Sequence, residues 1–546
     1  MLSSVLDMDE AANRKLGTWD SVRAVTGSWR LLSVALLSFS SGLPLGLVWL
    51  AVPAWMARSG VDIKVVGLFT LAQAPWSFKP LWAPLLDRFA PPFLGPKRGW
   101  VLIAQGALLV IGLGFSAAAR TPGDLVTVGI LCLATAFASA TQDIAYDAYA
   151  VEVLRPEEHG LAVGARTALY RLGMLVSGGA GITLAGVFDV TILGRSIHSE
   201  GSWVTVHVLL ALLYLPLMVV TWLAPEPEAT VTRPSTLGDA VWKPFVAFLR
   251  QHRALEILAF VVLYKLSDNL TQALTRPFLI QMGFDDFDVG VATASIGQAA
   301  AIAGTFLGGV LTNRIGLGRS LWIFGVLQLV SNLGYAAVAQ VGPNRPLMYA
   351  AQAFELGASG LGSGAFGVLM LRLTERRFSA TQFALLSSLF SLPRIGSGPV
   401  AGVLAAALGW RDFFISTVLF GIPCLLLLSR FVPWSARDVQ FRVETREGAP
   451  PATVTTMLVG AASGFIAALA AGTLALAAVK ALAALSAHPA GGFLLAPHLL
   501  RLLEPATLVD WLTTGGVLCF AVVAGLAVAG VQAARGGGPQ EESPRA

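Results

Sequence analysis

Ionisable side chains stand inside long apolar segments of this chain, at spacings that put several of them on one helix face. The clearest group is Lys265, Asp268, Gln272 and Arg276, which fall within about 80° of arc at 100° per residue. Such groups are costly inside a membrane and usually face a cavity or pair with one another. Because arginine offers a planar fork of donors that fits carboxylate or phosphate, this stripe predicts recognition of an anion.

A second polar group lies in the segment around residues 142–149. Gln142, Tyr146 and Tyr149 share one helix face there, while Asp143 and Asp147 lie one turn apart on the adjoining face. The tyrosine rings could stack on a sugar, although packing is their commoner role in a membrane helix. The predicted substrate-binding residues are Lys79, Gln142, Tyr146, Tyr149, Arg166, Arg171, Gln272, Arg276 and Arg394.

Cations outnumber carboxylates among the side chains inside the apolar segments. The six cations are Lys79, Arg166, Arg171, Lys265, Arg276 and Arg394, and the four carboxylates are Asp143, Asp147, Asp268 and Glu355. The surplus favours a cationic cavity for an anionic substrate, and complete internal pairing is the alternative. Lys265 and Asp268, three residues apart, are predicted to form a structural ion pair.

Proton coupling is assigned to carboxylates because the histidines lie in or near predicted loops, with His207 at a segment edge. Burial, or a second carboxylate close by, can bring a carboxyl group into the range where it exchanges protons. The predicted proton-coupling residues are Asp143, Asp147, Asp268 and Glu355.

The composition defines the class of protein. The 546 residues are 55% hydrophobic and 13% charged, with mean hydropathy +0.70, and soluble domains carry about 25% charged residues. This excludes a soluble enzyme, a disordered chain and a nucleic-acid binder. Cys132, Cys424 and Cys519 lie singly in apolar runs, and no nucleotide loop, catalytic triad or metal-ligand spacing is present. A helical membrane protein without enzymatic activity or cofactor is expected.

Fourteen apolar segments have about the length that crosses a bilayer. They lie at 31–56, 65–86, 100–119, 125–150, 161–188, 203–223, 255–281, 289–312, 320–340, 346–371, 380–409, 411–432, 455–479 and 508–532. Of 37 Lys and Arg residues, 23 lie in or at the edge of the loops on the N-terminal side and 8 on the other side. The positive-inside rule therefore predicts both termini in the cytoplasm. The polar first 30 residues are not a signal peptide.

The first twelve segments form two halves in register. Asp87 and Asn313, each after the second segment of its half, are 226 residues apart, and Arg171 and Arg394 are 223 apart. Two parallel six-helix repeats are the layout of major facilitator transporters, whose substrate site lies between the halves. The predicted fold is therefore an all-α membrane protein of the major facilitator fold, with two further C-terminal helices.

The loop after the second segment of each half is predicted to act as a gate. A carboxylate there can hold a neighbouring helix N-terminus in one state and release it when the halves rock. The predicted gating residues are Asp87, Arg88, Asn313 and Arg314. Lys97 and Arg98 are interpreted as ordinary positive loop residues.

Composition changes along the chain set the predicted domain boundaries. They are a cytoplasmic N-terminal segment at 1–30, a six-helix bundle at 31–223, a cytoplasmic linker at 224–254, a second six-helix bundle at 255–432, a cytoplasmic loop at 433–454, an accessory helix pair at 455–532 and a cytoplasmic tail at 533–546. The accessory pair is rich in Ala, Leu and Gly and is not expected to belong to the transport pathway.

Several blocks resemble the AmpG family of muropeptide permeases. They are SSGLP at 40–44, FKPLWAPLLDR at 78–88, SATQDI at 139–144, YRLGMLVSG at 170–178, APEP at 224–227, LYKL at 263–266 and FSATQFALL at 378–386. The resemblance covers residues 30–432 and departs at Pro96, where a basic residue is usual. It implies import of anhydromuropeptides (GlcNAc–anhydro-MurNAc with or without peptide) from periplasm to cytoplasm, dependence on the proton gradient, and a role in cell-wall recycling and β-lactamase induction.

Two alternatives to muropeptide import stay open. One is a transporter of another anionic solute, such as acetyl-CoA, since a related clade resembles acetyl-CoA transporters. The other is a non-transporting sensor or a pigment- or lipid-handling partner, against which the charge retained in both halves argues. The expected partners are an anionic glycopeptide, protons and the lipid bilayer, without nucleic acid. The expected location is the bacterial inner membrane, where the chain acts as a monomer.

Overall fold

The computed structural model describes residues 27–58, 61, 74–118, 124–180, 199–227, 236–434, 436–439, 454–487, 494–504 and 508–535. Within these ranges the chain forms helices and no β-strand, as the all-α prediction requires. Most of the predicted N-terminal segment and tail, and parts of the second and fifth predicted apolar segments, lie outside the described residues.

The N-terminal half contains the helices before residue 224. They are α3 (Trp29–Gly46), η1 (Leu47–Ala51), α4 (Val52–Arg58), α6 (Ala74–Phe78), η3 (Lys79–Leu81), α7 (Ala83–Arg88), α8 (Arg98–Ala118), α9 (Leu125–Val153), η4 (Pro156–Glu158), α10 (His159–Met174), η5 (Leu175–Ala180), α12 (Ser199–Leu212) and α13 (Tyr214–Leu223).

The remaining helices form the linker, the second half and the accessory pair. They are α14 (Leu237–Leu249), α15 (Ala254–Leu263), α16 (Leu266–Gln281), α17 (Asp286–Gly290), η6 (Val291–Ile296), α18 (Gly297–Ile315), α19 (Leu317–Ser331), α20 (Leu333–Val341), α21 (Arg345–Leu373), η7 (Arg376–Phe378), α22 (Ser379–Leu408), α23 (Trp410–Phe431), α24 (Val454–Ala487), α25 (Ala496–Leu503) and α26 (Leu508–Arg535).

Helices α9 and α21 occupy matching places in the two halves and begin in the same way. Helices α9 and α21 each have 29 residues, and each begins after a side-chain cap, Asp124 on the Thr127 amide and Asn344 on the Leu347 amide. Such caps satisfy amides that have no partner within the helix. The hydrogen bonds from Thr127 also hold the pKa of Asp124 below its ordinary value. The same local chemistry therefore starts the same helix in both halves.

Among the described residues, nine helices are long and apolar enough to cross a membrane. Helical residues lie within each of the fourteen predicted segments. The protein is thus a multi-pass membrane protein, while the count of fourteen spans and the cytoplasmic location of the termini stay predictions.

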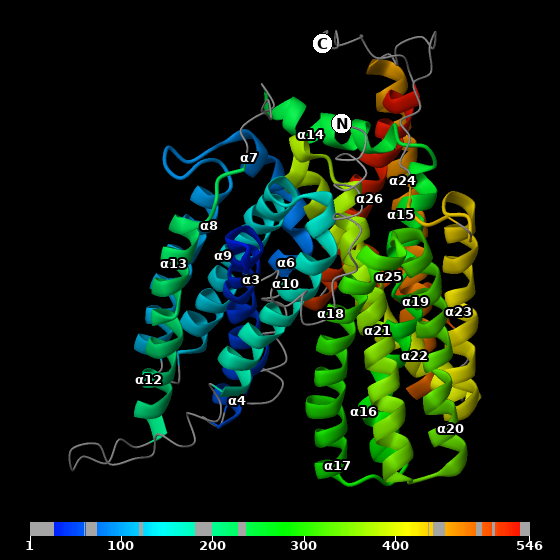
Figure 1. Cartoon of the computed structure of the whole chain (residues 1–546). Helices are drawn as coiled ribbons and strands as arrows, with labels where there is room; N and C mark the ends of the chain where they lie inside the picture. The colour runs from blue at the N-terminus through cyan, green and yellow to red at the C-terminus, as the bar shows by residue number, and fades with distance from the viewer. Residues whose placement is uncertain are drawn as a thin grey trace, which may run out of the picture.

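The halves approach closely at one end of the molecule and diverge at the other (Figure 1). We call the end that carries α14 the linker end. The largest buried apolar cluster lies there and combines residues of both halves, such as Ile144 with Phe366, whereas two further clusters each contain residues of one half only. The shared core therefore joins the halves at the linker end.

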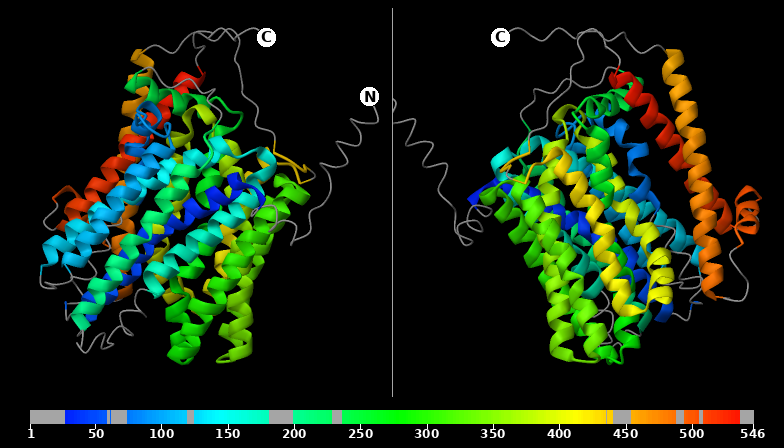
Figure 2. Two further views of the ribbon diagram at one scale, coloured as in Figure 1. Left: turned by 60° about the vertical axis from the view of Figure 1, so that its left-hand side comes forward. Right: turned by 90° about the vertical axis from the view of Figure 1, so that its right-hand side faces the viewer.

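The accessory helices α24 and α26 pack on one another along one flank of the molecule (Figure 2). Lys480 on α24 and Asp510 on α26 form an ion pair at 3.4 Å. Only 6% of the apolar window of α24 is buried, so most of this helix faces outward. Near its C-terminal end α26 contacts α14, where Gly530 lies against Leu249.

Candidate functional site

In the N-terminal half, two cations on η3 and α10 lie close to two carboxyl groups on α9. Asp147 forms ion pairs with Lys79, at 3.7 Å, and with Arg166. Asp143, one turn earlier on α9, is within electrostatic reach of Lys79. Two cations therefore face two carboxylates, which leaves less free positive charge here than the count along the chain suggests.

Aromatic and amide side chains of α9 pack instead of facing open space. Tyr146 is 2% exposed and donates to the Val34 carbonyl at 2.9 Å, with Arg166 over its ring. Tyr149 is fully buried and donates to the Pro225 carbonyl at 2.9 Å. Gln142, also fully buried, donates to two serines of α3. In this conformation these three residues hold α9 to its neighbours, and their place in the substrate site stays a prediction.

In the C-terminal half, Lys265 is the centre of a dense polar network. It lies where α15 ends and α16 begins, and its ammonium contacts Asp268 at 2.8 Å, as the spacing predicts. It also contacts the Gln328 amide oxygen at 2.5 Å and both the carbonyl and the hydroxyl of Ser359, at 2.7 and 2.9 Å. Lys265 and Asp268 are 6% and 3% exposed.

Glu355 on α21 lies beside this network. Its Oε1 accepts from the Gln272 amide at 3.0 Å, while its Oε2 is buried without a hydrogen-bond partner among the described residues. Gln272 and Arg276 are exposed on α16. The predicted stripe on α16 therefore runs from a buried ion pair to a solvent-exposed guanidinium.

Two arginines at matching places in the repeat reach across to the other half. Arg171 on α10 donates to the Gln298 amide oxygen of α18 at 2.5 Å. The guanidinium carbon of Arg394, on α22, lies 5.0 Å from the ring centroid of Trp49 in η1, and Trp76 lies edge-on to Trp49. Sequence reasoning missed Trp49 and Gln298 because both lie in apolar runs with no charged neighbour.

Asp87 closes the linker end by contacts to both halves. Its carboxylate accepts from the Lys97 ammonium at 2.7 Å and from the Ala380 and Thr381 amides of α22 at 3.2 and 2.9 Å. Lys97 also lies 3.6 Å from Glu152. Burial alone would lower the pKa of Lys97, but the Asp87 and Glu152 carboxylates raise it above its ordinary value. Lys97 therefore stays charged beside Asp87, whose carboxyl group lies at the α22 N-terminus.

Asn313 makes the corresponding contact in the second half of the repeat. Its Oδ1 accepts from the Gly160 amide at the start of α10 at 3.2 Å, and its amide donates to the Glu157 carbonyl at 2.8 Å. The other two predicted gating residues have different surroundings. Arg88 lies over the ring of Phe89, and Arg314 Nη2 is buried without a hydrogen-bond partner among the described residues.

The interpretation of Lys97 and Arg98 as ordinary loop residues is wrong. Lys97 is 4% exposed and bonded as described above. Arg98 pairs with Glu226 and donates to the Trp222 and Ala224 carbonyls at the end of α13. The charge count shows where these residues lie but not that carbonyls and carboxylates of distant helices surround them.

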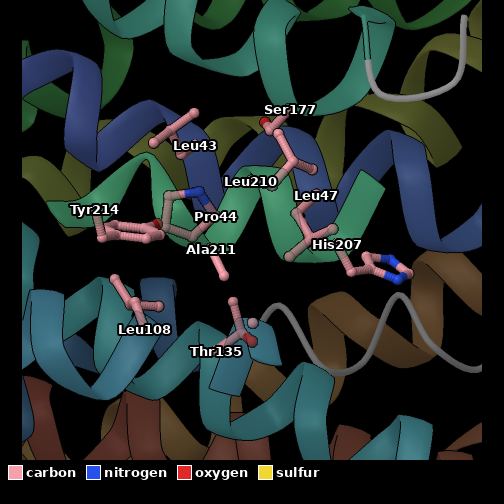
Figure 3. A pocket seen from close by; sticks show the side chains of 11 residues that line it. Leu43, Pro44, Leu47, Leu108, Thr135, Ser177, His207, Leu210, Ala211 and Tyr214 are labelled. Atoms are coloured by element: carbon pink, nitrogen blue, oxygen red, sulfur yellow. The ribbon is translucent and has the colours of Figure 1, made fainter. Parts of the chain in front are cut away.

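Two of the histidines that the sequence places in or near loops or at a segment edge are buried. His159 and His207 are 6% and 1% exposed, and neither ring nitrogen of either residue has a hydrogen-bond partner among the described residues. His207 lies among aromatic rings at a small pocket inside the N-terminal bundle, together with Leu47 and Tyr214 (Figure 3). This pocket lies within one half, so it is separate from the residues that bridge the two halves.

Comparisons with known proteins agree with this architecture. Residues 34–397 match the Major Facilitator Superfamily. The anhydromuropeptide permease of Escherichia coli strain K12 is 42% identical over 397 residues, which cover 72% of this chain and 78% of the permease. A protein named putative transporter AmpG 4, from Rickettsia felis, is 27% identical over 73% of this chain and 96% of its own.

Solved structures show the same fold at low sequence identity. The proton:xylose symporter XylE has a TM-score of 0.57 at 11% identity and covers 75% of this chain and 97% of its own. The transporter FucP in the outward conformation has a TM-score of 0.57 at 14% identity, over 73% and 98%.

The chain belongs to the major facilitator superfamily, and it is a transporter rather than an enzyme. Within the superfamily it is a member of the AmpG family of muropeptide permeases, as the blocks quoted above predict.

Proposed function

We propose that this protein imports anhydromuropeptides, GlcNAc–anhydro-MurNAc with or without peptide, from the periplasm to the cytoplasm of a bacterium, driven by the proton gradient. The similarity to the anhydromuropeptide permease supports the substrate class. The excess of Lys and Arg in alternate loops supports a cytoplasmic linker end, and the conformation described here would then be closed to the cytoplasm.

The observation that carries this proposal is a set of three arginines left without a carboxylate. Arg171, Arg276 and Arg394 form no ion pair with the described residues, whereas Lys79, Arg166 and Lys265 each do. Carboxylates of lactyl and peptide groups would satisfy such guanidinium groups with charge-assisted hydrogen bonds. Trp49 beside Arg394 supplies an aromatic face of the kind that packs against a sugar ring.

Uptake by the purified protein in liposomes tests the proposal. Radiolabelled GlcNAc–anhydro-MurNAc tripeptide should accumulate when the outside is acidic, and a protonophore should abolish the accumulation. Excess unlabelled acetyl-CoA should not compete. Competition by acetyl-CoA, or no uptake by folded protein under any gradient, would contradict the assignment.

A charge-removing variant tests the anion site itself. Arg276→Gln should weaken binding by about 1.5–3 kcal/mol, the worth of a charge-assisted hydrogen bond. The loss should shrink for an analogue with masked acidic groups, because no anion then remains to be held. Wild-type affinity in a titration with the acidic tripeptide would remove Arg276 from the site.

A further inference from the structure

The carboxyl group of Glu355 is buried and forms no ion pair with the described residues. It is 1% exposed, and its Oε1 accepts a hydrogen bond from the neutral amide of Gln272 at 3.0 Å. Its second oxygen, Oε2, has no donor among the described residues. Because a buried carboxylate needs a cation or several donors to stay ionised, this environment favours the protonated acid.

Among the described residues, the charged and titratable groups that face Glu355 include a single cation. They are Lys265 and Asp268, where α16 begins, and Tyr335 on α20. The ammonium of Lys265 has three protons and already contacts Asp268, Gln328 and Ser359. Tyr335 donates its single proton to Gln352 at 2.8 Å. One cation therefore serves two carboxyl groups, and one proton makes the cluster neutral.

The carboxylates of the N-terminal half have a different balance. Asp147 is paired with both Lys79 and Arg166, and Asp143 lies within reach of Lys79. Asp268 is paired with Lys265. Asp147 and Asp268 therefore each have a cation within ion-pair distance, whereas Glu355 has none among the described residues.

Glu355 also has a route to solvent through one side chain. Gln272, its donor, is exposed on α16, and Arg276 is exposed one turn further along. Water that reaches Gln272 would therefore lie one side chain away from Glu355. A ligand held by Arg276 would lie beside this route.

We propose that Glu355 is the group that binds and releases the transported proton, an inference that rests on the function proposed above. On the side where Gln272 meets water, hydronium gives its proton to the Glu355 carboxylate, leaving water and the neutral acid. When the other side opens, the acid returns the proton to water. Lys265 and Asp268 take no part in this proton transfer.

Glu355→Gln tests this inference because the amide imitates the protonated acid. The variant should bind radiolabelled GlcNAc–anhydro-MurNAc tripeptide at acidic pH as wild type does, and it should exchange labelled for unlabelled tripeptide across liposomes. It should lose all accumulation driven by a pH gradient. In wild type, affinity should fall about tenfold per pH unit above the titration of one linked proton, and in Glu355→Gln it should not change with pH.

Asp412→Asn is the matched control, since Asp412 is an exposed carboxylate at the start of α23 with 63% of its side chain accessible. It should keep gradient-driven accumulation and the pH dependence of binding. Infrared difference spectra between acidic and alkaline wild type, recorded without substrate, should contain a protonated-carboxyl band that Glu355→Gln lacks and Asp412→Asn retains.

The outcomes separate the two proposals. Gradient-driven accumulation by Glu355→Gln, or an unchanged infrared band in that variant, would overturn the role of Glu355 while leaving muropeptide import intact. If wild type does not take up the tripeptide, the proposed function fails, and the infrared band still decides whether Glu355 titrates. If Glu355→Gln does not fold, the protonated-carboxyl band of wild type is compared with that of Asp268→Asn. The band should persist in Asp268→Asn, and its loss there would contradict the assignment to Glu355.

Discussion

At the scale of single residues, burial divides the ionisable side chains into those with partners and those without. Residue type and helical spacing were enough to predict the Lys265–Asp268 pair and the exposed stripe on α16. They could not predict that Gln328 and Ser359, 63 and 94 residues away in the chain, complete the shell of Lys265. Nor could they show that Lys79 and Arg166 share Asp147, because such contacts depend on how helices pack.

Asp87 provides the first residue-scale prediction. Asp87→Asn should weaken the closed state of the linker end by about 1.5–3 kcal/mol, because α22 loses a charged acceptor and Lys97 loses a counter-ion. Transport should slow while equilibrium binding of substrate stays nearly intact, as measured by uptake and titration of the same preparation. Asp285→Asn, at an exposed side chain, is the control. An equal fall in binding and transport would contradict the gating role.

His159 provides the second residue-scale prediction, which concerns the dependence of protein stability on pH. Burial first, and then Arg372 and Arg376, lower the pKa of His159 from 6.5 to about 4. The folded protein therefore holds this histidine neutral, and stability is full above pH 6.5 and falls as the pH drops from 6.5 toward 4. The loss is at most about 1.4 kcal/mol per pH unit. The melting temperature of wild type should fall over this range more than that of His159→Phe, and parallel curves would exclude His159 as the cause.

At the scale of helices, small residues determine how closely neighbours approach. A Cβ on Gly304 would lie 2.3 Å from the Gly357 carbonyl oxygen, so α18 and α21 pack backbone to backbone. Close backbone packing at glycine also joins the two halves, where α10 contacts α18 at Gly160 and Gly309. The sequence alone does not show which glycines face the other half.

Gly160→Ala tests the contact between the halves separately from the fold. Its Cβ would lie 2.2 Å from the Gly309 carbonyl oxygen and 2.4 Å from Asn313 Oδ1, both in the other half. The variant should fold but shift toward a conformation open at the linker end. Spin labels at Glu157 and Arg319, both exposed, should report longer distances than in wild type.

The control for this variant is Gly290→Ala, because nothing lies within 4 Å of a Cβ at Gly290. It should leave the spin-label distances unchanged. Reduced folded yield of Gly160→Ala with wild-type distances would show that the contact supports folding and not the conformational equilibrium.

At the scale of the whole molecule, the repeat was predictable and the conformation was not. Asp87 and Asn313 occupy matching places in the chain and contact matching helices, α22 and α10, of the opposite half. Local chemistry repeats along the sequence, so two similar halves follow from it. Which end is closed depends on the sum of contacts across the halves, and no single segment encodes that sum.

The accessory pair provides the last prediction. A chain that ends at residue 439 should retain substrate uptake, because α24 is mostly unburied and contributes none of the charged side chains assigned to the site. Its melting temperature should fall, since α14 loses its contact with α26 near Gly530 and α22 loses its contact with α24. Full-length Gly530→Leu, which disturbs the contact with α14, should reproduce part of the loss of stability. Absence of uptake by a truncated protein that is folded and inserted would instead place α24 and α26 in the transport cycle.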